Sequence, residues 1–250
     1  MVEQVERTEK ERAHFDLLAE QFGEVGSYRT TAAGLCRMRR RGRMVTELLR
    51  GTPDPYVLEI GAGAGALSQF VLEELPSLRL LGYDISPKCV EIAREKYCQK
   101  YKNARFEVGD CTKLQHDDNT FDCVCGCSIL HHLPLNSTLA ECFRVLKPGH
   151  FIWFSEPNMM NPQIALEKNV KFILRRLHNT ETETAFFRWA LTRTLSGTGF
   201  KNIQVRPFDF LHPYLPDPFI GMVSAMGRLL EQIPLLKEIA GSLVIQAQKP

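Results

Sequence analysis

The chain has 250 residues and a mass of 28.5 kDa, so it can bury roughly three-quarters of its unfolded surface in a core that needs no disulfides. Its 44% apolar and 24% charged residues are ordinary for a globular enzyme and exclude a disordered, collagen-like or coiled-coil chain. The net charge of +2, from 31 Lys and Arg against 29 Asp and Glu, argues against a protein that coats nucleic acid.

The sequence carries no sign of export or membrane insertion. Residues 1–18 are charged where a secretory signal would need an apolar core. No stretch reaches about 18 apolar residues without a charge, so no membrane span is predicted. The 8 cysteines include no CxxC pair, and without a signal we expect reduced thiols rather than a disulfide framework. We therefore expect a cytoplasmic protein.

The hydrophobic periodicity predicts two helices, at residues 3–24 and 31–50, followed by alternating strands and helices. The strands are predicted at 56–60, 78–83, 104–108, 121–127, 150–155, 199–206 and 241–248. The helices between the first five strands are predicted at 66–75, 87–100 and 136–146. Strands that alternate with helices of this kind form a parallel sheet covered on both faces. We therefore expect an α/β, Rossmann-like fold.

A glycine-rich turn, with the sequence EIGAGAGA at residues 59–66, follows the first predicted strand and opens a helix. Glycine permits a tight turn and lets a ligand approach the backbone beside a helix N-terminus. Taken as a dinucleotide pattern, Gly61, Gly63 and Ala66 fit, and Asp84 lies about where a ribose contact is expected. A turn of small residues that packs the helix on the strand is the structural alternative.

Five segments, in the right order, resemble the motifs of class I S-adenosylmethionine-dependent methyltransferases. They are VLEIGAGAGALSQF (57–70), GYDIS (82–86), EVGDCTKL (107–114), FDCVCGCSILHHL (121–133) and RVLKPGHFIWFSEP (144–157). The resemblance covers residues 12–157 well and residues 185–250 in outline. It implies a seven-stranded, mostly parallel sheet whose last strand is antiparallel, and S-adenosyl-L-methionine as the cofactor.

The resemblance also implies how the cofactor is bound. Asp84 would accept the two ribose hydroxyls, and Asp110 would accept the exocyclic amine of adenine, while Glu59 would lie near the cationic methionine end. A sulfonium cofactor needs acidic and carbonyl partners, whereas a dinucleotide needs N–H donors for its pyrophosphate. The alternatives are a helix N-cap for Asp84, a turn for Asp110 and an edge charge for Glu59. The predicted cofactor-binding residues are Glu59, Gly61, Ala62, Gly63, Asp84, Ile85, Asp110, Cys111 and Ser128.

Candidate catalytic residues lie where the fourth and fifth strands end, because ligands of open α/β sheets bind outside the carboxyl ends of the strands. Methyl transfer is a direct displacement that depends on positioning and desolvation, and an O-methyltransferase can add a general base. The candidates are His131, His132 and Glu156. A structural or cofactor-side role is the alternative for the two histidines, and an ordinary polar contact is the alternative for Glu156.

We expect a single methyltransferase domain over residues 1–250. It would consist of an N-terminal helical segment (1–50), a cofactor-binding core (51–157) and two acceptor-side insertions (158–190 and 207–240). The second insertion predicts a helix with Asp217 as its N-cap and Pro218 at its first position, followed by an apolar stripe. This helix packs on the sheet or on a second copy, or it covers a lipid-like, polyketide or quinone-like acceptor.

Two further patterns admit a structural and a functional interpretation. Six arginines lie between residues 37 and 50, and such a helix binds RNA or an anionic membrane, forms a solvated face, or pairs with acidic neighbours. No aromatic residues are interleaved with them, so nucleic acid is not an expected partner.

Cys123, Cys125 and Cys127 share one face of a strand, where we expect apolar core residues and no metal site. A thiophilic metalloid acceptor is the alternative.

The sequence thus predicts a S-adenosylmethionine-dependent methyltransferase that acts on a small-molecule acceptor, with a hydroxyl oxygen slightly ahead of carbon or nitrogen. The alternatives are an RNA or protein methyltransferase and a non-catalytic cofactor-binding partner protein. A homodimer and a peripheral membrane contact are both compatible with this prediction.

Overall fold

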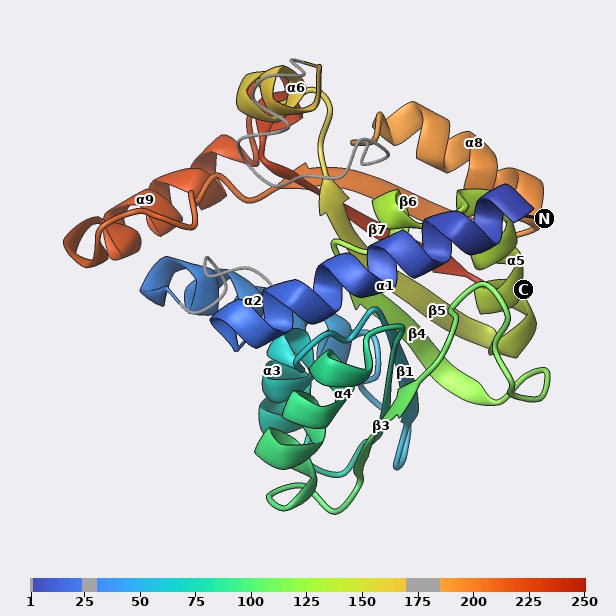
Figure 1. The fold of residues 1–250 in the computed structure, drawn as a ribbon. Helices are drawn as coiled ribbons and strands as arrows, with labels where there is room; N and C mark the ends of the chain where they lie inside the picture. The colour runs from blue at the N-terminus through green and yellow to red at the C-terminus, as the bar shows by residue number, and fades with distance from the viewer. Residues whose placement is uncertain (1, 24–30, 170–184) are drawn as a thin grey trace.

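The computed structural model describes residues 2–23, 31–169 and 185–250, so part of the predicted 158–190 insertion lies outside the described residues. A twisted sheet runs through the middle of the molecule, with helices on both of its faces (Figure 1). The sheet has seven strands in the order β3-β2-β1-β4-β5-β7-β6. The strands are β1 (Tyr56–Ile60), β2 (Arg79–Asp84), β3 (Ala104–Val108), β4 (Phe121–Cys127), β5 (Leu146–Pro157), β6 (Lys201–Phe208) and β7 (Ser242–Gln248).

The pairing of the strands confirms the predicted topology. Strands β1 to β5 pair with one another in parallel, and β7 is antiparallel to both β5 and β6. The chain runs from β1 outward through β2 and β3, then returns to β4 on the other side of β1. A ligand site is expected at this reversal, outside the carboxyl ends of the strands.

The helices divide between the two faces of the sheet, and each face has its own apolar cluster. One cluster includes Val45, Phe70 and Val90, from α2, α3 and α4, and the other includes Leu139 and Leu195, from α5 and α8. The helices are α1 (Val2–Phe22), α2 (Ala32–Glu47), α3 (Ala66–Glu74), α4 (Pro87–Ala93), α5 (Leu135–Val145), α6 (Pro162–Asn169), α8 (Arg188–Thr198) and α9 (Asp217–Leu230).

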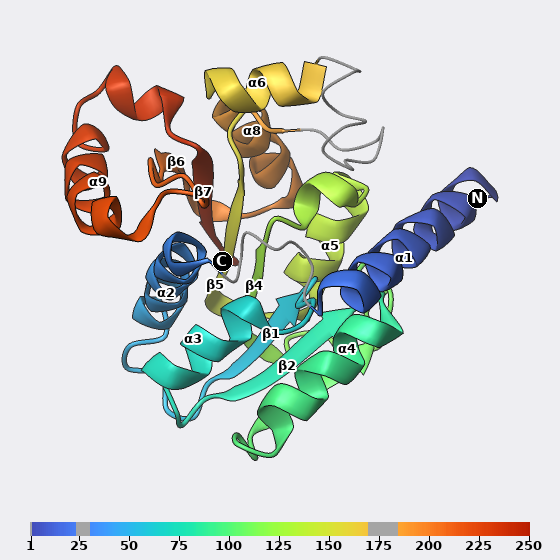
Figure 2. The same cartoon turned by 60° about the vertical axis from the view of Figure 1, so that its left-hand side comes forward.

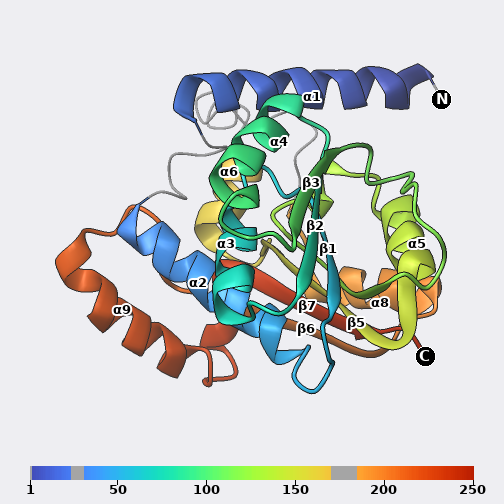
Figure 3. The ribbon, with the colours of Figure 1, turned by 90° about the horizontal axis from the view of Figure 1, so that it is seen from below.

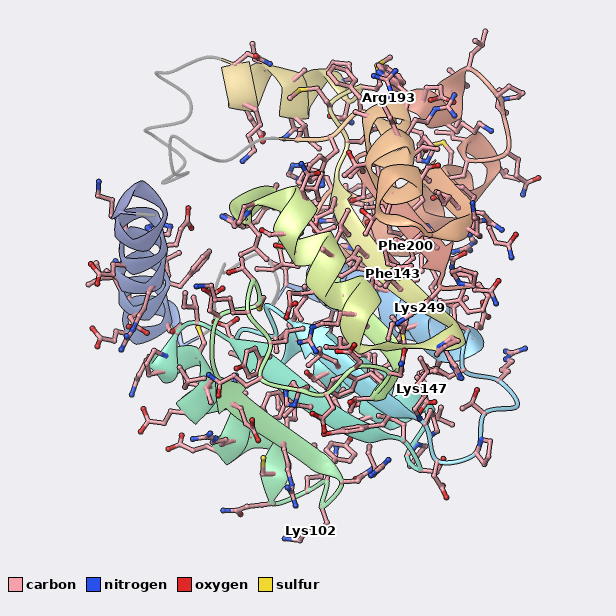
Figure 4. The ribbon with its side chains drawn as sticks, turned by 90° about the vertical axis from the view of Figure 1, so that its right-hand side faces the viewer. Lys102, Phe143, Lys147, Arg193, Phe200 and Lys249 are labelled. Atoms are coloured by element: carbon pink, nitrogen blue, oxygen red, sulfur yellow. The ribbon has the colours of Figure 1, made fainter. Side chains whose placement is uncertain are left out.

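Strand β4 shows why the sheet is parallel and central. All seven of its residues are buried, which is typical of a strand covered on both faces. Cys123, Cys125 and Cys127 point to the α2–α3 face and join its apolar cluster, as their alternation predicts. On the opposite face Phe143 of α5 packs edge-on against Phe200, with ring centroids 5.0 Å apart (Figure 4).

The structure differs from the predicted elements at several places. The helix predicted over 87–100 becomes a π-helix, η2, at Arg94–Cys98. Helix α6 forms inside a segment that the sequence presents only as a connection. Helix α9 starts at Asp217 itself, and Pro216 occupies the N-cap with an extended backbone, so the predicted N-cap was one residue too late. Two 3₁₀ turns, η3 (Leu130–His132) and η4 (Leu236–Ile239), were not predicted.

No helix within the described ranges is long and apolar enough to cross a bilayer.

Candidate functional site

The glycine loop after β1 can be built only from glycine at two of its positions. Gly61 and Gly65 have φ angles of +63° and +83°, in the left-handed region that other residues rarely adopt. A Cβ atom on Gly61 would lie 2.4 Å from Cγ1 of Ile129, and one on Gly65 would lie 2.4 Å from Cε2 of Tyr97. The loop is therefore held close both to the turn after β4 and to the π-helix that follows α4.

Asp84 ends β2 and binds the glycine loop directly. Its side chain is buried; Oδ2 accepts the N–H of Gly63 at 2.7 Å, and Oδ1 accepts the N–H of Ser86 at 2.9 Å. The N-cap of α4 is Ser86, whose Oγ accepts the N–H of Cys89 at 3.1 Å, so the N-cap interpretation of Asp84 is wrong. Ile85, half-buried, lies between these two residues.

The end of β3 meets the same loop. Asp110 forms the predicted turn with one oxygen, since Oδ1 accepts both the N–H and the hydroxyl of Thr112 at 2.8 and 2.7 Å. Its Oδ2 has no hydrogen-bond partner in the described part of the chain. The thiol of Cys111 is buried, which raises its pKa to about 12; the charge of Asp84 acts in the same direction, and a hydrogen bond from the Gly61 backbone opposes it. The ends of β1, β2 and β3 thus converge at one edge.

Glu59 lies on the central strand β1, so the edge-charge interpretation is wrong. Its side chain is buried, and Oε2 accepts the hydroxyl of Ser68 from α3 at 2.5 Å.

Ser128, at the end of β4, is held at a φ of +56°, and its N–H donates to the carbonyl of Ser155 at 2.8 Å. A serine rarely adopts a left-handed backbone conformation, so the packing around this turn must hold Ser128 in it.

Several of the loop's own N–H groups already have acceptors within the fold. Gly61 and Ala62 both donate to the carbonyl of Tyr83, at 2.8 and 3.2 Å, and Gly63 donates to Asp84. A dinucleotide pyrophosphate would need such N–H groups as donors. The acceptors at this edge are carboxylates, which suit hydroxyls, an exocyclic amine and a sulfonium. The donor and acceptor chemistry therefore fits S-adenosylmethionine and disfavours the dinucleotide interpretation.

Two of the predicted catalytic residues form a buried pair. Nδ1 of His131 lies 2.7 Å from Oε2 of Glu156, and Oε1 of Glu156 accepts the N–H groups of Ile129 and Leu130, each at 2.9 Å. Burial lowers the pKa of His131, and the hydrogen bond and charge of Glu156 oppose this only in part. The imidazole is therefore neutral at pH 7, and Glu156 holds the turn after β4 in place.

The third predicted catalytic residue, His132, contacts helix α1. Its Nδ1 lies 3.3 Å from Oε2 of Glu11, and its ring packs edge-on against Phe15 with centroids 5.2 Å apart. Further along α1, Oδ1 of Asp16 accepts the hydroxyl of Ser86 at 2.5 Å. Helix α1 therefore bridges the turn after β4 and the start of α4, and in Figure 3 it lies across α4. The sequence predicts this helix but gives no signal for these contacts.

The segment after β6, part of the predicted acceptor-side insertion, is held to the core by the arginines of α2. Arg41 is buried; its guanidinium lies 2.8 Å from Oδ2 of Asp209 and donates to the hydroxyls of Ser155 and Ser242, each at 3.1 Å. Arg37 lies 2.6 Å from the same Oδ2. Of the interpretations open for the arginines, pairing with acidic neighbours is the one confirmed.

No group of three His, Cys, Asp or Glu residues suited to a metal occurs in the described ranges.

The chain is similar to known methyltransferases. A family model described as "Methyltransferase domain" matches residues 57–149, which hold the glycine loop, Asp84, Asp110 and the histidines. The chain is 29% identical over 181 residues to a demethylmenaquinone methyltransferase of Chlorobaculum tepidum, covering 65% of this chain and 72% of that protein. It is 38% identical over 96 residues to the erythromycin 3''-O-methyltransferase of Saccharopolyspora erythraea, covering 37% of this chain and 31% of that protein.

The fold is also that of solved methyltransferases. A S-adenosylmethionine-dependent methyltransferase from Thermotoga maritima superposes with a TM-score of 0.62 at 17% identity, over 96% of this chain and 99% of that one. A structure from Archaeoglobus fulgidus gives 0.62 at 19% identity, over 93% and 98% of the two chains. From the matched domain, the relatives and the fold together, the chain belongs to the class I S-adenosylmethionine-dependent methyltransferases and is an enzyme.

Proposed function

We propose that the chain binds S-adenosyl-L-methionine over the carboxyl ends of β1 to β4 and transfers its methyl group to a small, apolar, quinone-like acceptor. The observation that carries the cofactor site is the contact between Asp84 and the N–H of Gly63. It fixes a buried carboxylate beside the turn that the cofactor must approach. In this proposal Asp84 accepts the ribose hydroxyls, and the free Oδ2 of Asp110 accepts the adenine amine beside the N–H of Cys111.

The remaining cofactor residues serve the methionine end. Gly61, Ala62 and Gly63 let the cofactor approach the backbone, and Ser128 lines the far side of the loop. Glu59 contributes negative charge beneath it, as its burial against Ser68 of α3 allows. When bound, S-adenosylmethionine supplies an electrophilic methyl group on a cationic sulfur. The chain's contribution is to orient the acceptor, exclude water and take up a proton.

We assign the proton to His131. Its Nδ1 faces Glu156, so Nδ1 carries the hydrogen and Nε2 is left as the basic nitrogen. The neutral imidazole suits the removal of a proton from an acceptor hydroxyl as the methyl group is transferred. In this scheme Glu156 orients His131, and His132 joins helix α1 to the site through Glu11 and Phe15.

The acceptor class is supported by the relatives. The Chlorobaculum tepidum protein is named for demethylmenaquinone and the Saccharopolyspora erythraea protein for a 3''-oxygen of erythromycin, and both acceptors are small molecules. The +2 charge gives no general attraction for nucleic acid. A small-molecule acceptor is therefore favoured over RNA or protein.

Calorimetric titration of the pure protein with S-adenosylhomocysteine, with NADH as the control, tests the cofactor site. We expect binding of the first and none of the second. Binding of NADH alone would make the glycine loop a dinucleotide site. Once the cofactor is fixed, transfer of labelled methyl from S-adenosylmethionine to a panel of naphthoquinols tests the acceptor class, with glycosylated macrolides and a bulk RNA preparation as the contrasting acceptors.

A further inference from the structure

The exposed apolar side chains gather in one stretch of the chain. Of the 16 large hydrophobic residues exposed in the described ranges, 13 lie between residues 160 and 239, and the other three are Leu17, Leu35 and Val108. Single exposed hydrophobic residues are normal, whereas a gathering of this size marks an interaction site. The apolar surface, as we name it, consists of Met160, Leu166, Phe187, Trp189, Tyr214, Phe219, Met222, Met226, Leu229, Ile233, Leu235, Leu236 and Ile239.

Helix α9 supplies four residues of this surface, Phe219, Met222, Met226 and Leu229. Gly227 lies against Phe210, and Ser224 Oγ lies 4.0 Å from Sγ of Cys36 in α2, so one face packs inward. Met222 and Leu229 are exposed on another face. Figure 2 shows α9 on the outside of the molecule, next to α2. A helix at a protein surface normally turns polar residues outward, so the outer face of α9 requires a partner.

Specific contacts join the neighbouring parts of the apolar surface. Nδ2 of Asn161, just before α6, donates to the carbonyl of Ile239 in η4 at 2.7 Å. Arg188, at the start of α8, lies 3.0 Å from a carboxylate oxygen of Glu238. The rings of Phe187 and Trp189 stack with centroids 4.8 Å apart. Helices α6, α8 and η4 therefore present their apolar side chains from one connected region, to which residues 231–235 join α9.

The charges around the apolar surface are asymmetric. Asp209, Glu231 and Glu238 are paired with arginines, with Glu231 2.5 Å from Arg40. Among the described residues of 158–240, Glu167 and Asp217 are the acidic side chains outside ion pairs. Five basic side chains there make no ion pair with a described residue: Arg193, Lys201, Arg206, Arg228 and Lys237. Arg193 is an exposed residue of α8 (Figure 4). Three of these five, Arg193, Arg228 and Lys237, lie on α8, α9 and η4, against Glu167 on α6 and Asp217 on α9, so the helices that carry the apolar surface have an excess of positive charge.

We propose that the apolar surface docks the protein onto an anionic lipid bilayer as a peripheral contact. An apolar face with basic residues around it is attracted to anionic headgroups and buries its side chains at the acyl boundary. Trp189 suits this boundary, because its ring is apolar and its N–H is polar. A second copy of α9 would cover only the α9 part of a surface that also spans α6, α8 and η4. The proposal does not depend on the identity of the acceptor or on methyl transfer.

Co-sedimentation with vesicles tests the proposal. The protein without cofactor is mixed with vesicles of phosphatidylcholine and phosphatidylglycerol in equal parts, and with phosphatidylcholine vesicles as a comparison. We expect binding to the anionic vesicles that weakens as salt rises. The double variant Met222→Gln/Leu229→Gln should lose at least tenfold in partitioning. Leu17→Gln is the matched control, because Leu17 and Leu229 are each 64% exposed, and it should bind as the wild type does.

The charge contribution has its own variants. Arg228→Gln and Lys237→Gln should each weaken binding to the anionic vesicles roughly fivefold and leave binding to phosphatidylcholine unchanged. Circular dichroism and S-adenosylhomocysteine titration should be unchanged in every variant, which separates this test from that of the methyltransferase site. The proposal is overturned if wild-type protein stays in the supernatant, or if the double variant sediments as the control does. It is also overturned if light scattering shows a dimer that the double variant dissociates, since a second copy then covers the surface.

Discussion

The carboxylate of Glu156 holds both His131 and the backbone of the turn in which His131 lies. One oxygen is 2.7 Å from Nδ1 of the imidazole, and the other accepts the N–H groups of Ile129 and Leu130. A side chain near the end of β5 thus sets the position and the tautomer of a histidine that follows β4. This arrangement explains how a buried imidazole can be both fixed in place and neutral.

Replacing His131 by Ala should lower kcat about 10²- to 10⁴-fold if it is the general base, with the affinity for S-adenosylhomocysteine unchanged. Burial lowers the pKa of His131 from its ordinary value of 6.5. The imidazole therefore stays unprotonated down to pH 6.5, so the wild-type rate should be constant down to this pH and should decline only in more acidic solution. Glu156→Gln removes the charge that raises this pKa, so kcat should fall and its acidic limb should move to lower pH. A pH profile of kcat measures both effects, with His150→Ala as the control. Full activity of His131→Ala would remove this residue from the mechanism.

Asp84→Asn should weaken S-adenosylhomocysteine binding about 100-fold, because the neutral amide no longer accepts two charge-assisted hydrogen bonds from the ribose. Calorimetric titration measures this loss, and thermal unfolding checks that the contact to Gly63 still holds the loop. Asp118→Asn is the control, since Asp118 is 67% exposed and pairs only with Arg144 at 2.8 Å. Equal affinities of the Asp84 variant and the wild type would contradict the ribose assignment.

The sequence predicted the cofactor half of the fold closely. Strands β1, β3 and β4 begin and end at the predicted residues, because buried parallel strands are short apolar runs that turns delimit. The residues predicted to bind the cofactor lie at or just after the carboxyl ends of β1 to β4 for the same reason. Local pattern also placed Asp84 at the end of β2, since a charged residue after an apolar run is readable without any partner.

The contacts that complete the site could not be predicted. Arg37 and Asp209 are 172 residues apart in the chain, and no local pattern connects them. Glu11 and Asp16 look like ordinary polar positions of an amphipathic helix, and only the docking of α1 shows their contacts with His132 and Ser86. The π-helix at Arg94–Cys98 was missed because its residues continue a helical pattern, whereas its geometry depends on packing.

Gly61→Ala should destabilise the protein by at least about 2 kcal/mol and reduce cofactor binding. The φ of +63° costs a side chain roughly 1–2 kcal/mol, and the added Cβ would lie 2.4 Å from Ile129, which forces the turn after β4 to move. Urea denaturation gives the free energy of unfolding. The control is Gly197→Ala in α8, where no atom lies within 4 Å of the added Cβ, and it should stabilise the helix by up to about 1 kcal/mol. Equal stabilities of the two variants would show that the loop tolerates a side chain.

Asp209 should make the protein sensitive to acid. Burial raises its pKa, but the charges of Arg41 and Arg37 prevail and lower it from 3.8 to about 2 in the folded state. Because the folded pKa lies below the unfolded one, the stabilisation is complete above about pH 4 and is lost as the pH falls through 2. The two values correspond to about 2 kcal/mol in the free energy of unfolding.

Asp209→Asn should cost about 3–5 kcal/mol at pH 7, because it leaves the guanidinium of Arg41 buried without its carboxylate. It should also flatten the dependence of stability on pH between about 2 and 4, which urea denaturation at several pH values measures. Glu47→Gln is the control, since the pair that it breaks with Arg50 is exposed and contributes less than about 1 kcal/mol. A variant as stable as the control would mean that Arg37 and Arg41 do not need Asp209 to hold the segment after β6 against α2.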